Sequence, residues 1–143
     1  MKSARLFVYG SLRLPAVQAA LLGHRLPSWP AAIRGYRAWT WSDLPYPAVW
    51  PQAGGTVQGQ VLRVPTGDWR LLDAWEETPR RYRRRPVTVR LADGRTWHAE
   101  VYVAAIFPGP VPWRGPEQLP PLEALAAEAA GVRRAELGGR QSL

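Results

Sequence analysis

The sequence predicts an α+β fold, a single domain in which one mixed or antiparallel sheet curls into a β-barrel and a few peripheral helices pack against it. Three observations lead to this prediction. The chain has 143 residues, 46% of them hydrophobic, which suits one domain with a substantial core. Segments of strand character dominate the middle of the chain, and three segments of helical character are spread along it. We expect the domain to cover residues 1–143, with residues 132–143 as a loose C-terminal tail.

The first third of the chain predicts a strand, a short helix and further strands. The apolar run Arg5 to Tyr9 has strand character. The segment Pro15 to Leu22 predicts a helix, because proline suits a first helical position and Gly23 follows as a stop signal. Further extended segments are predicted over residues 33–41, 46–51 and 56–64, with a turn at Gly54 and Gly55.

The rest of the chain predicts two helices that flank a hairpin. Residues 66–77 change to a helical period, and Pro79 prevents the helix from continuing. The Asp93-Gly94 pair predicts a tight hairpin between two strands. Residues 107–121 contain six prolines and predict a long irregular segment. The alanine-rich stretch from Leu122 predicts a helix that ends at Gly131.

The composition argues against several classes of chemistry. The absence of cysteine excludes disulfides, thiolate catalysis and cysteine-based zinc sites. The two histidines, His24 and His98, lack ligand spacing, so no metal site is expected. No apolar run has the length of a membrane span, and the N-terminus lacks the pattern of a signal peptide. The expected protein is soluble and cytoplasmic.

The net charge of +8 comes almost entirely from arginine, since Lys2 is the single lysine among 19 basic residues. An arginine-rich, alanine-rich and proline-rich chain can acquire this composition through codon bias, which weakens an inference of nucleic-acid binding. The densest basic run is Arg80 to Arg85. We interpret it as a solvated loop, and the alternative is a patch that binds an anionic ligand or nucleic acid.

One glutamate near the end of the helix over 66–77 is placed to have unusual chemistry. At about 100° per residue, Glu76 lies at the rim of an apolar arc of tryptophan and leucine, and Glu77 lies on the far side. Desolvation at such a rim raises the pKa of a carboxyl, which suits a general base near neutral pH. The alternative is an ordinary boundary glutamate paired with an arginine of the 80–85 run.

The turn after the first strand offers a complementary feature. The tetrapeptide Tyr9-Gly10-Ser11-Leu12 can present successive backbone N–H groups to a carboxylate, or to an oxygen that gains charge in a transition state.

Together these segments resemble the gamma-glutamylcyclotransferase-like family over roughly residues 5–115. The stretch "VYGSLR" resembles the signature loop of the family, and "LLDAWEETPRRYRRRPVTV" contains its Leu-Asp-x-x-Glu and Tyr-x-Arg segments. The late strand "AEVYVA" resembles the strand that carries a family tyrosine. Ser11 runs directly into Leu12 without an intervening asparagine, which favours the gamma-glutamylamine cyclotransferase branch.

The resemblance implies a mixed β-barrel with a cavity at one end and an activity that needs no cofactor or metal. It implies conversion of a gamma-glutamyl amine or amino acid into 5-oxoproline and a free amine, with Glu76 as the general acid and base. The resemblance also implies substrate-binding roles for Tyr9, Gly10, Ser11, Leu12, Tyr102 and Trp113.

Two other functions remain open from the sequence. The first is a non-catalytic protein that binds a small carboxylated or amide ligand in the same cavity. The second is a polyanion or nucleic-acid binder that uses Arg80 to Arg85, which is the less favoured of the two. The expected partner is a small gamma-glutamyl molecule, and the sequence specifies neither its amine nor an oligomeric state.

Overall fold

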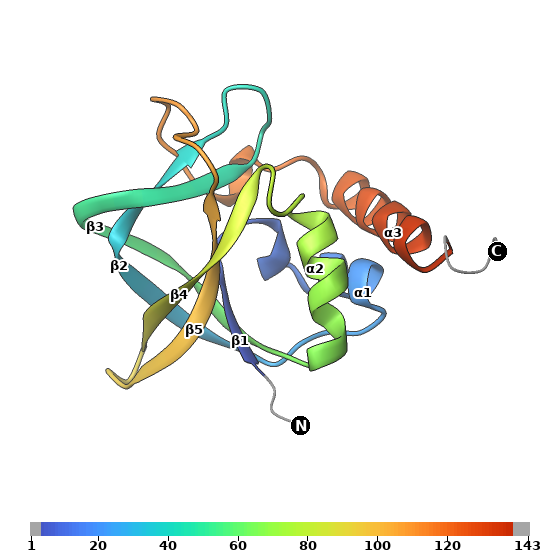
Figure 1. The fold of residues 1–143 in the computed structure, drawn as a ribbon, viewed down its shortest axis with the longest axis horizontal. Coiled ribbons are helices and arrows are strands. Elements are labelled where there is room, and N and C mark those ends of the chain that lie inside the picture. The colour runs from blue at the N-terminus through green and yellow to red at the C-terminus, as the bar shows by residue number, and fades with distance from the viewer. Residues whose placement is uncertain (1–3, 139–143) are drawn as a thin grey trace.

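Five strands form a closed barrel in the computed structural model, which describes residues 4–138 (Figure 1). The barrel order is β1-β3-β2-β4-β5, with a further pairing between β3 and β5. Sheet neighbours are antiparallel, except that β1 and β3 pair in parallel with β5. This architecture confirms the predicted mixed β-barrel. The strands are β1 (Ala4–Val8), β2 (Ser28–Thr40), β3 (Pro47–Val64), β4 (Tyr82–Leu91) and β5 (Thr96–Ala104).

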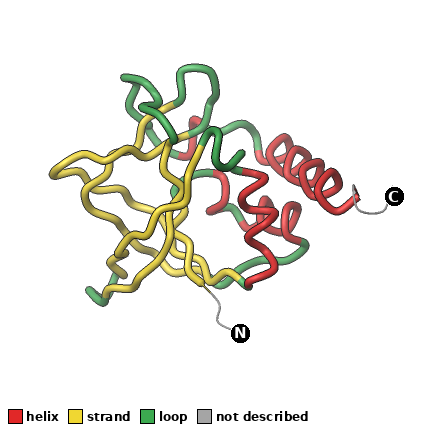
Figure 2. The backbone as a smooth tube through the Cα atoms, viewed as in Figure 1, coloured by secondary structure: helices red, strands yellow, loops and turns green. Residues whose placement is uncertain are grey.

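Three helices pack together on one side of the barrel, as Figures 1 and 2 show. Helix α1 has the predicted bounds, and Gly23 caps its end in the left-handed conformation with φ of 85°. No helix in the described part of the chain is both long and apolar enough to cross a membrane. The helices are α1 (Pro15–Leu22), α2 (Trp69–Trp75) and α3 (Leu122–Gly138), with 3-10 turns η1 (Ser11–Arg13), η2 (Thr66–Asp68) and η3 (Pro116–Gln118).

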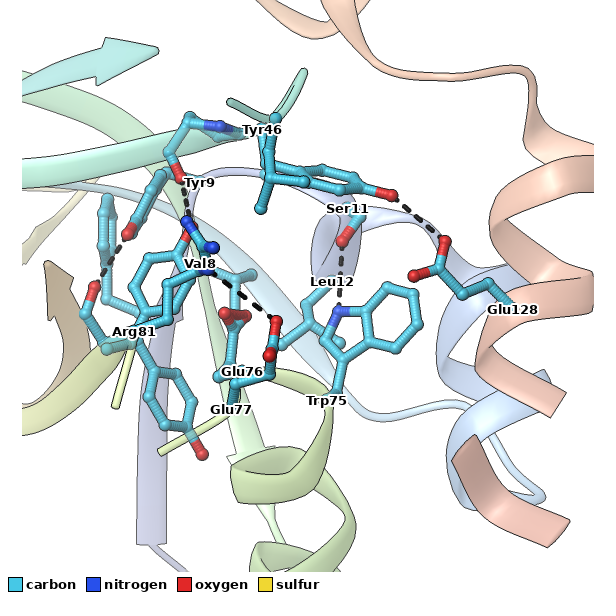
Figure 3. A pocket seen from close by; sticks show the side chains of 16 residues that line it. Val8, Tyr9, Ser11, Leu12, Tyr46, Trp75, Glu76, Glu77, Arg81 and Glu128 are labelled. Carbon is cyan, nitrogen blue, oxygen red and sulfur yellow. Dashed lines mark hydrogen bonds and ion pairs between the residues drawn. The ribbon is translucent and has the colours of Figure 1, made fainter. Parts of the chain in front are cut away.

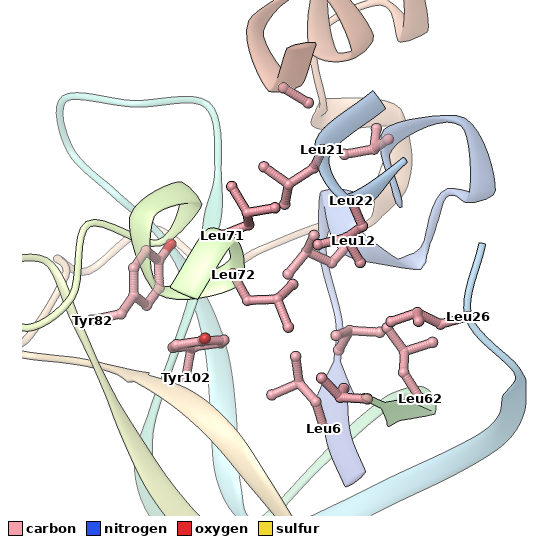
Figure 4. Packing of buried hydrophobic residues seen from close by; sticks show 14 of the residues in the cluster. Leu6, Leu12, Leu21, Leu22, Leu26, Leu62, Leu71, Leu72, Tyr82 and Tyr102 are labelled. Carbon is pink, nitrogen blue, oxygen red and sulfur yellow. The ribbon is translucent and has the colours of Figure 1, made fainter. Parts of the chain in front are cut away.

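Strand β1 ends in the apolar run Leu6 to Val8 because both of its faces are buried there. Phe7 points into the barrel, and the following Tyr9 belongs to the same interior cluster. Leu6 and Val8 point the other way and pack against the helices. Figure 4 shows Leu6 together with leucines of α1 and α2 in this second cluster. A strand between two cores reads as a continuous hydrophobic run, and its end is held rigidly beside the helices.

The predicted turn at Gly54 and Gly55 is wrong, because β3 continues through both residues as one long strand. Its pairing with β2 slips where Arg34 lies opposite Thr56 and Tyr36 lies opposite Pro51. The positive φ of Gly54, 78°, bends the strand there without reversing it. A glycine pair has the same local signature at a bulge as at a turn, and only the partner strand distinguishes the two.

Helix α3 passes through Gly131, so the predicted helix end there and the loose tail over 132–138 are wrong. Val132 packs against the helix-side core. Arg133 Nη1 donates a hydrogen bond to the Leu21 carbonyl oxygen at 3.3 Å, and Glu136 pairs with Arg70 at 3.5 Å. These contacts offset the roughly 1 kcal/mol that a helical glycine costs. Residues 139–143 of the predicted tail lie outside the described residues.

The hairpin prediction at Asp93-Gly94 is confirmed, and it corrects the interpretation of Arg80 to Arg85 as a loop. Residues 82–91 form β4, so side chains of the basic run alternate across a strand. Arg84 Nε lies 3.0 Å from Asp73 Oδ1, and its Nη1 lies 3.2 Å from Glu100 Oε2. Arg83 and Arg85 are exposed. The run is therefore distributed over different surroundings and does not form one patch.

Candidate active site

A pocket of about 120 Å³ lies where the end of β1 meets the end of α2 and the side of α3 (Figure 3). It is the place where most of the residues singled out from the sequence come together. The predicted residues that line it are Tyr9, Gly10, Ser11, Leu12, Glu76 and Tyr102.

The loop after β1 lines this pocket with residues that have backbone donors left over from the turn. Within the turn, Arg13 N donates to Gly10 O and Leu14 N donates to Ser11 O, each at 3.1 Å. The N–H groups of Ser11 and Leu12 have no acceptor inside the turn, as is general for the first residues of a helical turn. The turn is held in place because Gln18 Nε2 donates to Leu12 O at 2.8 Å. The loop can therefore hold an anion or a carbonyl oxygen without rearranging.

The end of α2 directs two neighbouring glutamates to different surroundings. The prediction placed both in a helix, but α2 ends at Trp75. Glu76 is the C-cap residue, and its N–H donates to Leu72 O at 3.0 Å. Glu77 then takes a positive φ of 52°, which turns the chain. Glu76 is half-buried in the pocket, whereas Glu77 is exposed at its edge (Figure 3).

The surroundings of Glu76 favour its neutral form. Burial, and then the negative charges of Glu77 and Asp73, raise its pKa from 4.5 to about 8. Among residues 4–138, no side chain or backbone group donates a hydrogen bond to its carboxyl group, and no cation pairs with it. The group can therefore accept or release a proton near neutral pH, and it is free to bind a ligand.

The hydroxyl groups of three tyrosines around the pocket donate hydrogen bonds that hold neighbouring segments together. The Tyr9 hydroxyl donates to Tyr102 O at 2.7 Å, and the Tyr82 hydroxyl donates to Pro47 O at 2.7 Å. The Tyr102 hydroxyl donates to Asp73 Oδ1 at 2.7 Å. Burial raises the pKa of all three phenols, so they remain protonated and are poor bases. Glu76 is the lining group whose pKa is shifted towards neutrality.

Ser11 has a structural partner of its own. The indole nitrogen of Trp75 donates a hydrogen bond to Ser11 Oγ at 3.2 Å (Figure 3). This contact ties the loop after β1 directly to the last turn of α2, next to Glu76. The hydroxyl therefore fixes the distance between the two halves of the site.

Three polar residues of the pocket were not found from the sequence. Arg81 pairs with Asp43 at 3.1 Å and lies 3.8 Å from Glu77, so its charge is already balanced. At the mouth, the Tyr46 hydroxyl donates to Glu128 Oε2 at 3.2 Å. These residues come from separate segments, and no local motif marks them.

The structure does not bring Trp113 to this pocket. Its backbone N–H donates to Ala38 O at 3.1 Å, and the residue lines a second pocket. No group of three or more His, Asp or Glu residues is placed to hold a metal ion in the described part of the chain.

The class of protein is thus defined by a small barrel whose first strand ends in a donor-rich turn opposite the half-buried Glu76. The model of the family described as gamma-glutamyl cyclotransferase, AIG2-like, matches residues 6–120. The chain belongs to this family. It has no significant match among curated proteins.

Solved structures show the same fold. An Arabidopsis thaliana protein, At3g28950.1, is 31% identical with a TM-score of 0.67, over 73% of this chain and 64% of its own. The present chain thus spans less than two thirds of that protein. A mouse AIG2-like protein is 23% identical with a TM-score of 0.67, over 83% of this chain and 95% of its own. A gamma-glutamyl cyclotransferase is 14% identical with a TM-score of 0.67, over 99% and 86%. These two likenesses show the fold alone.

Proposed function

We propose that this protein is a gamma-glutamyl cyclotransferase, which converts a gamma-glutamyl amine or amino acid into 5-oxoproline and a free amine. The observation that carries the proposal is the pairing, in one pocket, of the unpartnered carboxyl group of Glu76 with the unused N–H groups of Ser11 and Leu12. Family membership supports the same reaction class.

The two sides of the pocket match the two reacting groups of the substrate, its α-ammonium group and its γ-amide carbonyl group. The substrate carries an α-ammonium group, which Glu76 can bind as its carboxylate. It also carries an amide carbonyl at the γ position, and its oxygen gains negative charge during attack. Backbone N–H groups that are already oriented stabilise such an oxygen more than water does, because they need not reorganise. In this assignment the Ser11 and Leu12 N–H groups face the oxygen, and Tyr9 and Tyr102 shape the wall.

The reaction needs no nucleophile from the protein. Glu76 takes a proton from the α-ammonium, and the freed amine attacks the γ-carbonyl carbon to close a five-membered ring. Glu76 returns the proton to the departing nitrogen as the tetrahedral intermediate collapses and the original amide C–N bond breaks. The carboxylate formed in this way takes the second proton from the ring nitrogen, which keeps one hydrogen as the lactam N–H, and passes it to solvent or to the product amine. The products are 5-oxoproline and the free amine, and no water is consumed. Because the attack is intramolecular, holding the chain folded supplies much of the acceleration.

A substrate panel tests the proposal. The purified protein is incubated with gamma-glutamyl amines and gamma-glutamyl amino acids, and 5-oxoproline is quantified by mass spectrometry. We expect release from at least one compound, and none from the matched α-glutamyl isomers, in which the amide is not at the γ position. Binding seen by thermal shift without any product would favour the non-catalytic small-ligand protein. No product and no binding would reject both.

Glu77 provides a test of the electrostatics. Its charge is the second cause of the raised pKa of Glu76, after burial, so Glu77→Gln lowers that pKa. The loss also leaves the nearby Arg81 guanidinium less neutralised, which acts in the same direction. We expect an acid limb of the kcat/KM profile near pH 8 in the parent protein, and we expect Glu77→Gln to move it to lower pH.

The measurement is kcat/KM between pH 5 and pH 10, where the substrate ammonium sets the basic limb for every variant. Glu123→Gln removes the same charge from an exposed position on α3 and should leave the profile unchanged. An acid limb that stays in place in the Glu77→Gln protein would show that it does not report Glu76.

A further inference from the structure

A second pocket adjoins the candidate active site and has the opposite charge. Its volume is about 430 Å³, and Tyr9 is the one described residue that lines both pockets. It lies between η1, the strands β2 and β3, and the segment 112–116. The active-site pocket is lined by three glutamates and one arginine, whereas this one is lined by three arginines and no acidic residue.

The three arginines, Arg13, Arg37 and Arg114, are not neutralised. In the part of the chain that the structure describes, none of their guanidinium groups pairs with a carboxylate. Arg81 and Arg84, by contrast, each have carboxylate partners. A concave surface lined by one sign of charge concentrates its field and attracts small counter-ions.

Arg13 carries a more specific signal. Its Nε atom is buried and has no hydrogen-bond partner within residues 4–138. A buried N–H on a cation that is cut off from water costs free energy unless an acceptor satisfies it. The residue is held there because its own backbone N–H closes the η1 turn on Gly10 O at 3.1 Å. An oxyanion that binds the guanidinium group of Arg13 from the pocket would offset the cost of burying this cation.

The walls of the second pocket are held in place before any ligand arrives. The segment that carries Trp113 is tied to β2, because Thr40 N donates to Val111 O at 2.7 Å and Trp113 N donates to Ala38 O at 3.1 Å. The Arg37 guanidinium lies over the Trp39 ring, 4.4 Å from its centroid. Stacking fixes the plane of a guanidinium and leaves its N–H edge free to bind an anion.

We propose that this pocket is a binding site for a small organic anion that carries two or more carboxylate or phosphate groups. The planar N–H fork of arginine matches both groups in bidentate geometry, and three unpaired forks favour more than a single negative charge. The half-buried Trp113 offers an apolar face to the rest of the molecule. The site is separate from the cyclisation chemistry, and it does not depend on that activity.

The geometry favours a small molecule over a nucleic-acid strand. Arg13, Arg37 and Arg114 line one pocket, whereas a strand is followed by a stripe of basic and stacking side chains. The exposed arginines of β4, Arg83 and Arg85, do not line the pocket.

Isothermal titration calorimetry with citrate and with pyrophosphate, at 0.15 M salt, tests the proposal. We expect saturable binding of at least one probe at one site per chain. The variant R13Q/R37Q/R114Q should bind at least about tenfold more weakly, because it loses several charge-assisted hydrogen bonds. The matched control R83Q/R85Q/R90Q removes three exposed arginines of β4 and has the same net charge, +8 − 3 = +5, but should bind like the parent protein.

The titration results either support or overturn the proposed anion site. A preference for citrate identifies a carboxylate ligand, and a preference for pyrophosphate identifies a phosphate ligand. Equal weakening in the two triple variants would mean attraction by net charge only, and no saturable binding by the parent protein would also overturn the site. If the triple variant does not fold, the exposed Arg114→Gln alone should still weaken binding severalfold. Glu76→Gln should bind the probe normally, which separates this site from the proposed activity.

Discussion

Glu76→Gln is expected to lower the release of 5-oxoproline by at least about 10³-fold, because the variant loses the described lining group whose pKa is raised towards neutrality and to which we assign the proton transfer. The amide has the shape of the protonated carboxyl group, so binding and fold should be kept. The α-ammonium of the substrate then has no acceptor, and the departing nitrogen has no donor. The measurement is kcat and KM on the best substrate of the panel, with circular dichroism as the check on folding.

Glu77→Gln is the matched control for this loss. It makes the same chemical change at the adjacent residue, which is exposed and lies at the pocket edge. It should remain active and differ mainly in its pH profile. If Glu76→Gln keeps more than about a tenth of the parent kcat, another group moves the proton, and the assignment of Glu76 fails.

The Glu76→Gln variant should also be more stable than the parent protein at alkaline pH. The folded protein holds the Glu76 proton with a pKa of about 8, and the unfolded chain holds it at the ordinary 4.5. The stability from that proton is fully present below pH 4.5 and is lost as the pH rises through about 8. Glutamine avoids this loss, so Glu76→Gln should gain up to about 4 kcal/mol at pH 9 and nothing at pH 4.

Urea unfolding of both proteins at the two pH values measures this difference. If Glu76→Gln gains stability at pH 9 and loses activity, the Glu76 carboxyl group lowers the free energy of unfolding of the parent protein while being required for catalysis. Equal stability of the two proteins at pH 9 would show that the carboxyl group is not desolvated as the structure indicates.

Gly59→Ala is expected to destabilise the barrel by about 3 kcal/mol or more, because the added methyl group has no space. A Cβ at this position would overlap the Val8 carbonyl oxygen and lie 2.8 Å from Phe7 Cζ. Val8 is the last residue of β1 and lines the candidate active-site pocket, and the donor-rich turn begins two residues later. The strand must therefore move at the point where it positions the site.

Gly67→Ala is the control for this substitution. Gly67 lies in η2 without a positive φ, and an added Cβ would meet nothing within 4 Å. We expect the free energy of unfolding to change by less than about 0.5 kcal/mol. Thermal and urea unfolding of the two variants should separate clearly, and similar losses in both would contradict the close approach of β3 to β1.

The turn of the candidate active site could be predicted from the sequence because its signal is local. The apolar run that ends at Tyr9 and the glycine after it define a strand end, and the N–H groups exposed there follow from the geometry of any such turn. The placement of Glu76 against apolar neighbours came from a helical wheel. The wheel does not strictly apply, since α2 ends at Trp75 and the positive φ of Glu77 separates the two carboxyl groups.

Residues that meet from distant segments could not be predicted in the same way. Tyr46 and Glu128 are 82 positions apart, and Arg81 and Asp43 are 38 apart. Trp113 illustrates the same limit, because its loop is tied to β2 and the residue lines the second pocket instead of the first. The position of a loop along the sequence does not predict which strand the loop will contact in the folded protein.

The sequence by itself determined the α+β class, the hairpin at Asp93-Gly94, the bounds of α1 and the family pattern, because these depend on periodicity and turn chemistry within a few residues. Only the tertiary structure decided that β3 runs unbroken through Gly54 and that α3 continues past Gly131. It also decided that two pockets of opposite charge share Tyr9. The physical reason is that a glycine's local preference is weak, about 1 kcal/mol, and strand pairing and packing with distant residues outweigh it.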